Sequence, residues 1–312
     1  MLEQFKPERL VAGLRPLTSA PAQALPQELA YRAFYGLEQL PAAHARMGYF
    51  DAGGYRVAAQ LWLPEQPKAT LILLHGYYDH SGLYGHVMRW ALEQNLAVMA
   101  LDLPGHGLSS GTRASINDFA EYQAVLEGAI ELVRELQLPA PLHLFGQSTG
   151  GAILIDYLLT ANPQSDIGET ILLAPLVRPR AWGWSKLSYL LLKSFVSKIE
   201  RRFSDNSHDP VFLDFLRNRD PLQPRNLPTA WVGALGRWVP RIENAPRSPR
   251  RPLVVQGEED RTVDWPYNLQ VLADKFAGPR VLRIKQARHH LANESAEFRA
   301  EYFSFLTEQL NR

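Results

Sequence analysis

The 312-residue chain contains no cysteine. Disulfide bridges, thiolate nucleophiles and cysteine-ligated metal sites are therefore excluded. An excess of either charge is also missing, because 33 basic residues face 32 acidic ones and the net charge is +1. This balance gives no electrostatic reason to expect nucleic acid or another polyanion as a partner.

Long apolar runs are absent as well, since no stretch approaches the roughly 18 apolar residues of a membrane-spanning helix. Residues 1–10 carry acidic side chains and a proline where a secretion signal needs an apolar core. We therefore expect a cytoplasmic protein. Hydrophobic residues make up 46% of the chain and charged residues 21%, which is typical of a globular protein large enough for one domain with an insertion.

Short apolar runs predict a mostly parallel sheet flanked by helices, an α/β fold. A hairpin is expected at 46–63 around Gly53-Gly54. Buried strands are expected at 70–74, 97–101, 142–145, 170–173, 252–256 and 280–284, and helices at 84–94, 116–137 and 149–161. Strands that alternate with helices at this spacing predict right-handed crossovers between parallel strands.

The alternation divides the chain into three parts. Residues 1–44 are expected to be a lead-in that lies over the surface, 45–176 together with 251–312 to form the sheet domain, and 177–250 to be an insertion without strands. The sequence leaves open whether 1–44 packs against the sheet domain or binds a partner. Within the insertion, apolar residues recur every four positions and predict one helix, namely at Leu187, Leu191, Phe195 and Ile199. This helix either packs against the main domain or forms a lid that lines an acyl pocket or touches a lipid surface.

The segment Gly146-Gln147-Ser148-Thr149-Gly150-Gly151 lies between a predicted strand and a predicted helix. Glycines on both sides of Ser148 permit the sharp strand-to-helix turn of a nucleophile elbow. Such a turn exposes the serine hydroxyl beside the free N–H groups of the helix, which suits an oxyanion. Ser148 is therefore the candidate nucleophile.

A nucleophilic serine needs an acid, a base and oxyanion donors. The strand at 252–256 leads into an acidic loop, where Asp260 is the candidate because earlier carboxyls lie too near the strand and Asp264 is placed to cap the next helix. His289 and His290 follow the strand at 280–284 and are adjacent, so one is the base and the other a bystander. The expected oxyanion donors are the backbone N–H groups of Tyr77, which follows His75-Gly76, and Thr149.

One alternative is a metal site. The run His75-x-Tyr77-x-Asp79-His80 approaches the H-x-H-x-D-H zinc signature of metallo-β-lactamase-like hydrolases, with His106 and His143 as further ligands. Tyr77 replaces the middle histidine and so removes a ligand that a two-metal site needs. We therefore expect His75 and His80 to hold their loop in place by hydrogen bonds.

Five segments together resemble the α/β-hydrolase superfamily, within it the branch of monoacylglycerol lipases, lysophospholipases and serine-aminopeptidase-like hydrolases. They lie in the family's order at 75–84, 102–111, 146–151, 257–263 and 289–294. The resemblance implies an α/β-hydrolase fold with an inserted helical cap, Asp260 as the acid, His289 as the base, and no metal or organic cofactor. The chain departs from the family pattern at Tyr78 (glycine in the family), Asp79 (glutamate), Gln147 (histidine) and Thr149 (methionine). Tyr78 and Thr149 are expected to crowd the acyl side of Ser148.

The sequence thus predicts a serine hydrolase that cleaves carboxylic esters through Ser148, His289 and Asp260. The expected substrate is a single-chain lipid ester such as a monoacylglycerol or lysophospholipid, with transient contact between the cap and a membrane surface. One alternative is a carboxylesterase or peptidase that acts on a small non-lipid substrate. Another is a hydrolase fold that serves as a receptor without turnover.

Overall fold

A computed structural model describes residues 4–18, 23–161, 163–193 and 195–311. Within these ranges eight strands form one sheet in the order β1-β2-β4-β3-β5-β6-β9-β10. Their bounds are β1 His44–Ala52, β2 Tyr55–Leu63, β3 Ala69–Leu74, β4 Leu96–Leu101, β5 Leu142–Gln147, β6 Ile167–Leu173, β9 Leu253–Gly257 and β10 Arg280–Ile284. Only β2 pairs antiparallel with its neighbours β1 and β4 among these strands, and the other pairs are parallel. The predicted mostly parallel sheet is confirmed.

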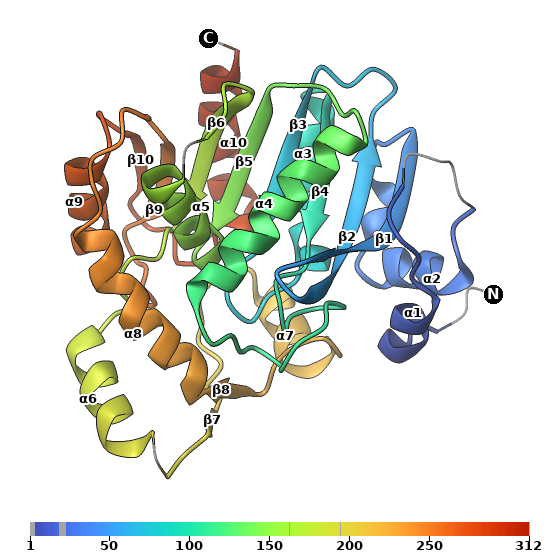
Figure 1. Cartoon of the computed structure of the whole chain (residues 1–312). Coiled ribbons are helices and arrows are strands. Elements are labelled where there is room, and N and C mark those ends of the chain that lie inside the picture. Colours follow the sequence, from blue (N-terminus) through green and yellow to red (C-terminus); the bar gives the residue numbers. More distant parts are fainter. Residues whose placement is uncertain (1–3, 19–22, 162, 194, 312) are drawn as a thin grey trace.

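Helices cover both faces of this sheet (Figure 1). On one face lie α4 (Phe119–Glu135), α5 (Thr149–Thr160) and α9 (Trp265–Lys275), and on the other α3 (Gly85–Glu93) and α10 (Ala296–Leu310). The predicted helix at 116–137 begins only at Phe119, because the Asp118 side chain accepts a hydrogen bond from the N–H of Ala120 and Glu121 completes a capping box. No helix in the described ranges is both long and apolar enough to cross a membrane.

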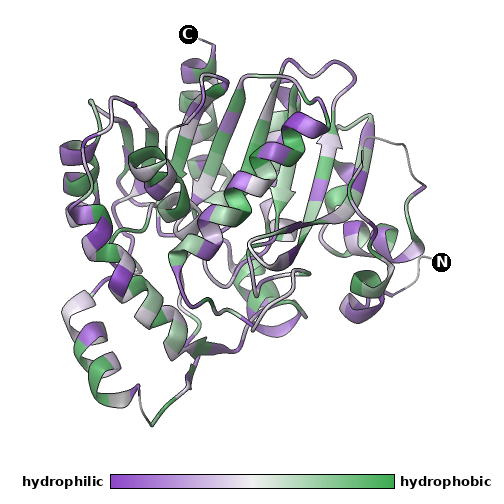
Figure 2. Cartoon of the chain, in the orientation of Figure 1, coloured by the Kyte–Doolittle hydropathy of each residue, from purple (hydrophilic) through white to green (hydrophobic). Residues whose placement is uncertain are grey.

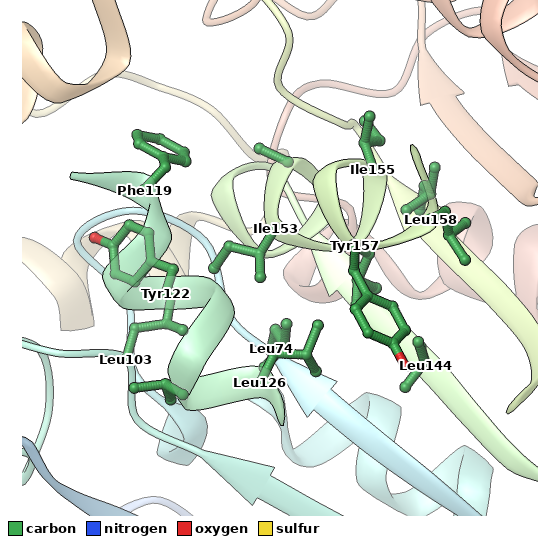
Figure 3. Packing of buried hydrophobic residues seen from close by; sticks show 14 of the residues in the cluster. Leu74, Leu103, Phe119, Tyr122, Leu126, Leu144, Ile153, Ile155, Tyr157 and Leu158 are labelled. Atoms are coloured by element: carbon green, nitrogen blue, oxygen red, sulfur yellow. The ribbon is translucent and has the colours of Figure 1, made fainter. Parts of the chain in front are cut away.

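The alternation of side chains along each strand produces two apolar cores. Ile72 and Leu74 of β3 face the core beneath α4 and α5, whereas Leu71 and Leu73 face the core beneath α3 and α10. Figure 3 shows the first core from close by, with side chains of both helices gathered around Leu74 and Leu144. The hydropathy colouring in Figure 2 accordingly shows α5 largely green, and α4 banded in green and purple.

The N-terminal segment packs into the fold instead of lying loosely over it. It forms α1 (Pro7–Gly13) and α2 (Pro26–Phe34), beside β1 and β2 in Figure 1. Leu10 and Tyr31 are completely buried, and the Tyr31 hydroxyl accepts a hydrogen bond from Gln60 of β2 at 3.1 Å. Packing is one of the two alternatives that the sequence left open. The sequence could not choose it, because short helices with few apolar anchors lack the long periodic pattern that reveals a packed element.

Residues 177–250 hold α6 (Trp182–Leu192), α7 (Pro210–Asn218) and α8 (Thr229–Glu243), all outside the main sheet. We call this segment the insertion. Contrary to expectation it also contains two strands, β7 (Lys198–Glu200) and β8 (Asn226–Pro228), which form an antiparallel ribbon. The predicted helix that included Phe195 and Ile199 ends at Leu192, and Ile199 belongs to β7.

The apolar side of α6 is exposed instead of packed against the main domain. The exposed fractions are 73% for Trp184, 62% for Leu190 and 65% for Leu191. The interpretation of this helix as a buried element was therefore wrong. Its four-residue periodicity was real, but periodicity alone does not show what covers the apolar side.

The turn from β5 into α5 depends on a close approach between backbone segments. A Cβ atom on Gly150 would lie 2.4 Å from the carbonyl oxygen of Leu74, and one on Gly146 would lie 2.4 Å from the carbonyl carbon of Gly150. Both distances are far shorter than a carbon atom tolerates, and the obstacles are backbone atoms of neighbouring elements. Side chains at either position would force β5, α5 and β3 apart.

We predict that Gly150→Ala lowers the free energy of unfolding by about 1–3 kcal/mol through this clash. Gly236→Ala is the matched control, because a Cβ at this position of α8 meets no atom within 4 Å. Alanine there should raise stability by about 0.5–1 kcal/mol, since it restricts the unfolded chain more than glycine does. Urea unfolding followed by tryptophan fluorescence measures both changes, and equal effects of the two substitutions would contradict the clash.

Candidate active site

Ser148 occupies the turn between β5 and α5. Its backbone has φ 51° and ψ −109°, outside the region that residues with a side chain normally adopt. Strain of this kind costs on the order of 1–3 kcal/mol and persists only where surrounding structure holds it. Here the Ser148 N–H donates to the Leu173 carbonyl, and its carbonyl accepts from Ala152 and Leu176. These bonds tie the turn to β6 and α5.

Asp260 and His289 come together from the ends of β9 and β10. His289 Nδ1 lies 2.7 Å from Asp260 Oδ2. The other carboxyl oxygen, Oδ1, accepts hydrogen bonds from the backbone N–H groups of Thr262 at 2.7 Å and Val263 at 3.1 Å. Gln256 of β9 donates to Oδ2 at 3.2 Å. The carboxyl group is thus fixed on both oxygens, and the imidazole nitrogen that faces it is held as the donor.

Attraction between these two groups outweighs the cost of burying them. Burial by itself would raise the pKa of Asp260, but His289 and the two backbone N–H groups hold it below its ordinary 3.8. Burial would likewise lower the pKa of His289, but the Asp260 carboxylate raises it above its ordinary 6.5. Each group therefore stabilises the charged form of the other.

His290, the neighbour of His289, belongs to a different pair. Its Nε2 lies 3.1 Å from Asp79 Oδ2, and Tyr84 donates to the same oxygen at 2.9 Å. The Tyr84 hydroxyl in turn accepts from the N–H of Gly76 at 2.9 Å. Burial would raise the pKa of Asp79, but His290 and Tyr84 hold it well below its usual range. This second pair fixes the loop that carries Gly76 and Tyr77.

Two side chains that the sequence did not mark as site residues anchor the loop bearing His289. Gln147, directly before Ser148, accepts through Oε1 from the N–H of Ala292 at 2.9 Å. Glu294 is completely buried and accepts from the N–H groups of Arg288 at 2.7 Å and His208 at 2.9 Å. For Gln147, the sequence offered one indication of this role, namely that the resembled family has a histidine at this position. Glu294 ends the motif at 289–294, and that motif alone gives no sign that its carboxylate anchors this loop.

Tyr77 and Thr149, the expected oxyanion donors, belong to the loop after β3 and to the start of α5. The Tyr77 ring stacks on Trp231 of α8, with ring centroids 3.8 Å apart, and its hydroxyl donates to Ala114 at 2.7 Å. A Cβ on Gly76 would lie 3.6 Å from Ser148 Cβ, so the backbone just before Tyr77 runs close to the serine. Thr149 is the first residue of α5, where N–H groups have no partner within the helix.

A cavity of about 220 Å³ opens over Ser148, Tyr77 and His289. The main domain contributes to its lining Gly76, Tyr77, Tyr78, Asp79, Gln147, Ser148, Thr262, His289 and His290, and the insertion contributes Arg201, Arg202, Phe203, Ser204, Asn206, Leu213, Leu216 and Arg217. No described side chain of α6 reaches it. The apolar helix predicted as the lining of an acyl pocket therefore lies elsewhere.

The histidines of the alternative zinc signature point to separate partners. His75 Nδ1 donates to the Gly76 carbonyl and its Nε2 accepts from the N–H of Leu103, while His80 Nε2 lies 3.0 Å from Asp220. His106 and His143 bond to backbone groups of Pro104 and Glu169. Across the described ranges no three histidines or carboxylates gather as metal ligands. As predicted for them, His75 and His80 form hydrogen bonds that hold their loop.

A model of the family described as Serine aminopeptidase, S33 matches residues 65–296. The chain belongs to this family. Members of it share the α/β-hydrolase fold seen here, and the resemblance to the monoacylglycerol lipase branch is confirmed. The protein is accordingly an ester hydrolase of the lipase and esterase type.

Two relatives and one solved structure similar to this S33 family chain are lipases of monoacylglycerols. A monoacylglycerol lipase of Mycolicibacterium smegmatis is 28% identical over 78% of this chain and 88% of its own length. The human monoglyceride lipase is 28% identical over 78% of this chain and 82% of its own length. A solved monoglyceride lipase of Saccharomyces cerevisiae superposes with a TM-score of 0.72 at 17% identity, covering 87% of this chain and 96% of that one.

We predict that the pKa of His289 lies above 6.5 and that Asp260→Asn lowers it below 6.5, because burial then outweighs the weaker attraction of Asp79 that remains. The charged histidine stabilises the fold fully below pH 6.5, and this contribution disappears as pH rises through the higher folded-state pKa. NMR titration of the imidazole nitrogens measures the value, with His289→Gln to assign the resonance. His290→Gln is the control and should leave the His289 pKa above 6.5. A His289 pKa that Asp260→Asn does not change would contradict the pairing.

Proposed function

We propose that this protein hydrolyses carboxylic esters with Ser148 as nucleophile, His289 as base and Asp260 as the acid that orients the base. One observation carries the proposal: the His289–Asp260 contact of 2.7 Å lies at the wall of the same cavity that Ser148 lines. A strained serine at a helix N-terminus and a buried, charge-paired histidine are the two parts that acyl transfer requires.

In the proposed mechanism, Ser148 Oγ attacks the ester carbonyl while His289 Nε2 takes its proton. The backbone N–H groups of Tyr77 and Thr149 donate to the oxyanion that forms. His289 then gives its proton to the departing alcohol, and the C–O bond of the ester breaks to leave an acyl-serine. A water molecule, deprotonated by His289, attacks the acyl-serine, and the proton returns to Ser148 as the carboxylic acid leaves. Asp260 stabilises His289 whenever the imidazole carries its second proton.

We further propose a single-chain lipid ester as the substrate and the insertion, residues 177–250, as a cap over the site. The support for a lipid is that the relatives named above are lipases of monoacylglycerols, together with the exposed apolar side of α6. The support for a cap is that α7 and the segment after β7 contribute nearly half of the residues around the cavity. Residues 45–176 and 251–312 would then form the catalytic domain, with 1–44 packed against it.

A small non-lipid ester is the alternative, and the cavity favours it. Its volume of about 220 Å³ is below the roughly 300–1,000 Å³ of common ligand pockets, and arginines line it. A long acyl chain therefore requires movement of the insertion, whereas an acetyl or butyryl ester does not.

The deciding experiment combines fluorophosphonate labelling with hydrolysis of p-nitrophenyl esters from C2 to C16. We expect Ser148→Ala to abolish labelling and to lower kcat by at least about a thousandfold. Ser109→Ala serves as the control for loss of a buried hydroxyl elsewhere and should still be labelled. Turnover that peaks at long chains supports the lipid substrate, and a peak at C2 to C4 supports the small ester. Labelling that survives in Ser148→Ala would refute the nucleophile.

We propose that the apolar side of α6 contacts a lipid surface transiently. Figure 2 shows green segments along this helix at the lower left, and Leu190 and Leu191 project most of their surface into solvent. Apolar patches of this kind on an isolated helix mark contact sites for membranes or proteins.

We therefore predict that the double substitution Leu190→Glu and Leu191→Glu weakens binding to phosphatidylcholine vesicles by at least about tenfold, since two apolar contacts are lost and two charges must approach lipid. Co-sedimentation with vesicles measures the binding. Val281→Glu is the control, because Val281 is 42% exposed on β10 of the main domain. Equal vesicle binding by the double variant and the wild type would contradict the contact.

A further inference from the structure

The cavity over Ser148 carries an excess of positive charge that the overall composition does not explain. Arginines 201, 202 and 217 line it. Among the described residues of its lining, Asp79 is the one carboxylate, and it already faces His290 at 3.1 Å. Arg217 forms an ion pair with Asp205. Arg201 and Arg202 have no carboxylate partner within ion-pair distance among the described residues. In a chain whose net charge is +1, this local excess is a property of the site.

Arg201 is held rigidly although no carboxylate of the described residues lies within ion-pair distance of it. Its N–H donates to the Arg225 carbonyl next to the β7–β8 ribbon, and its guanidinium donates to Gln223 Oε1 at 2.6 Å and to the Pro224 carbonyl at 3.2 Å. Both acceptors of the guanidinium are neutral. The side chain is partly buried, and burial lowers the pKa of Arg201, although the Asp79 carboxylate offsets part of this effect from beyond ion-pair distance. Burying a cation beside neutral partners costs free energy, because the charge loses water without gaining a counter-charge. An anion that binds to such a fixed cation recovers part of this cost.

Tyr78 forms the second support of Arg201. The guanidinium carbon of Arg201 lies 4.1 Å from the centre of the Tyr78 ring and 4.2 Å from that of Phe203. Tyr78 has φ 72°, which is strained for a tyrosine and normal for a glycine. This is the position at which the chain departs from the glycine of the resembled family. The strained tyrosine therefore has a structural role that a glycine could not fill, because the Arg201 guanidinium stacks on its ring.

We propose that Arg201, stacked on Tyr78 and assisted by Arg202, binds an anionic group, phosphate or carboxylate, carried by the ester substrate. Guanidinium groups bind these anions through paired N–H donors, which a fixed arginine presents without further ordering. Because Ser148 and Arg201 line one small cavity, the anion and the scissile ester belong to the same part of the substrate. The inference rests on the proposed ester hydrolysis at Ser148 and adds the charge of the substrate to it.

The test compares three lauroyl esters below their critical micelle concentrations: neutral 1-lauroylglycerol, 1-lauroylglycerol 3-phosphate, and lauroyl lactate with its carboxylate. The variants are Arg201→Gln, Arg201→Lys and Tyr78→Gly, with Arg247→Gln as a control at an exposed arginine outside the cavity. The readout is the ratio of kcat/KM for each anionic ester to that for the neutral ester. A purely structural role of Arg201 would lower all three values together and leave the ratio unchanged.

We expect the wild type to prefer at least one anionic ester by about tenfold or more, and Arg201→Gln to reduce that ratio by about tenfold. Arg201→Lys should keep part of the preference, because the charge remains while the paired donors are lost. Tyr78→Gly should reduce the ratio, because it removes the ring on which Arg201 stacks, while relief of the strained φ offsets part of the stability lost with the ring. Arg247→Gln should leave the ratio unchanged.

A wild type that favours the neutral ester, or a folded Arg201→Gln variant with an unchanged ratio, would overturn the inference. Inhibition of 1-lauroylglycerol hydrolysis by inorganic phosphate, without any preference among the esters, would also overturn it and indicate a site for free anions. The Ser148→Ala variant distinguishes failure of the proposed ester hydrolysis from failure of the proposed preference for anionic substrates. Hydrolysis that persists in Ser148→Ala defeats the proposed function itself, whereas its loss together with a flat ratio defeats only the assignment of charge.

Discussion

The close backbone contact between β5, α5 and β3 is the constraint on which the remaining site depends. Gly146 and Gly150 let these segments approach to distances that exclude any Cβ, and the turn between them holds Ser148 in a strained conformation. The sheet absorbs that strain because β5 is bonded on both sides, to β3 and β6. A turn in a peripheral loop would relax and withdraw the hydroxyl from the cavity. The rigidity of the central strands thus keeps Ser148 in place.

The partners of Ser148 depend on the same edge of the sheet. Parallel strands end on one side, so the loops after β3, β5, β9 and β10 converge there. Tyr77, Ser148 and His289 line one cavity, and Asp260 lies behind His289 at 2.7 Å. Each of the two adjacent buried histidines faces its own carboxylate, His289 facing Asp260 and His290 facing Asp79. Without His289, the buried Asp260 carboxylate would lose the attraction that holds its pKa below its ordinary value.

The main domain and the insertion have different roles in the proposed enzyme. The main domain supplies the groups for acyl transfer, and the insertion supplies Arg201 and the other cations of the cavity. Tyr78 links the two parts, since it belongs to the loop after β3 and stacks on Arg201 of the insertion. The buried contact of His80 with Asp220, to which Tyr35 also donates at 2.7 Å, joins all three regions of the chain. Such fixed contacts favour a well-ordered cavity wall.

The sequence by itself determined the main sheet and the order of its candidate site residues, because apolar periodicity and glycine spacing are local patterns that local sterics enforce. The strands of the main sheet and the segment around Ser148 were predicted for this reason. Tertiary structure alone decided the rest. The β7–β8 ribbon joins segments almost thirty residues apart, and α6 carries a periodic apolar side that stays largely exposed. The placement of Arg201 on Tyr78 likewise needs two distant loops to meet. Contacts between distant segments arise from packing of the whole chain, and no local pattern encodes them.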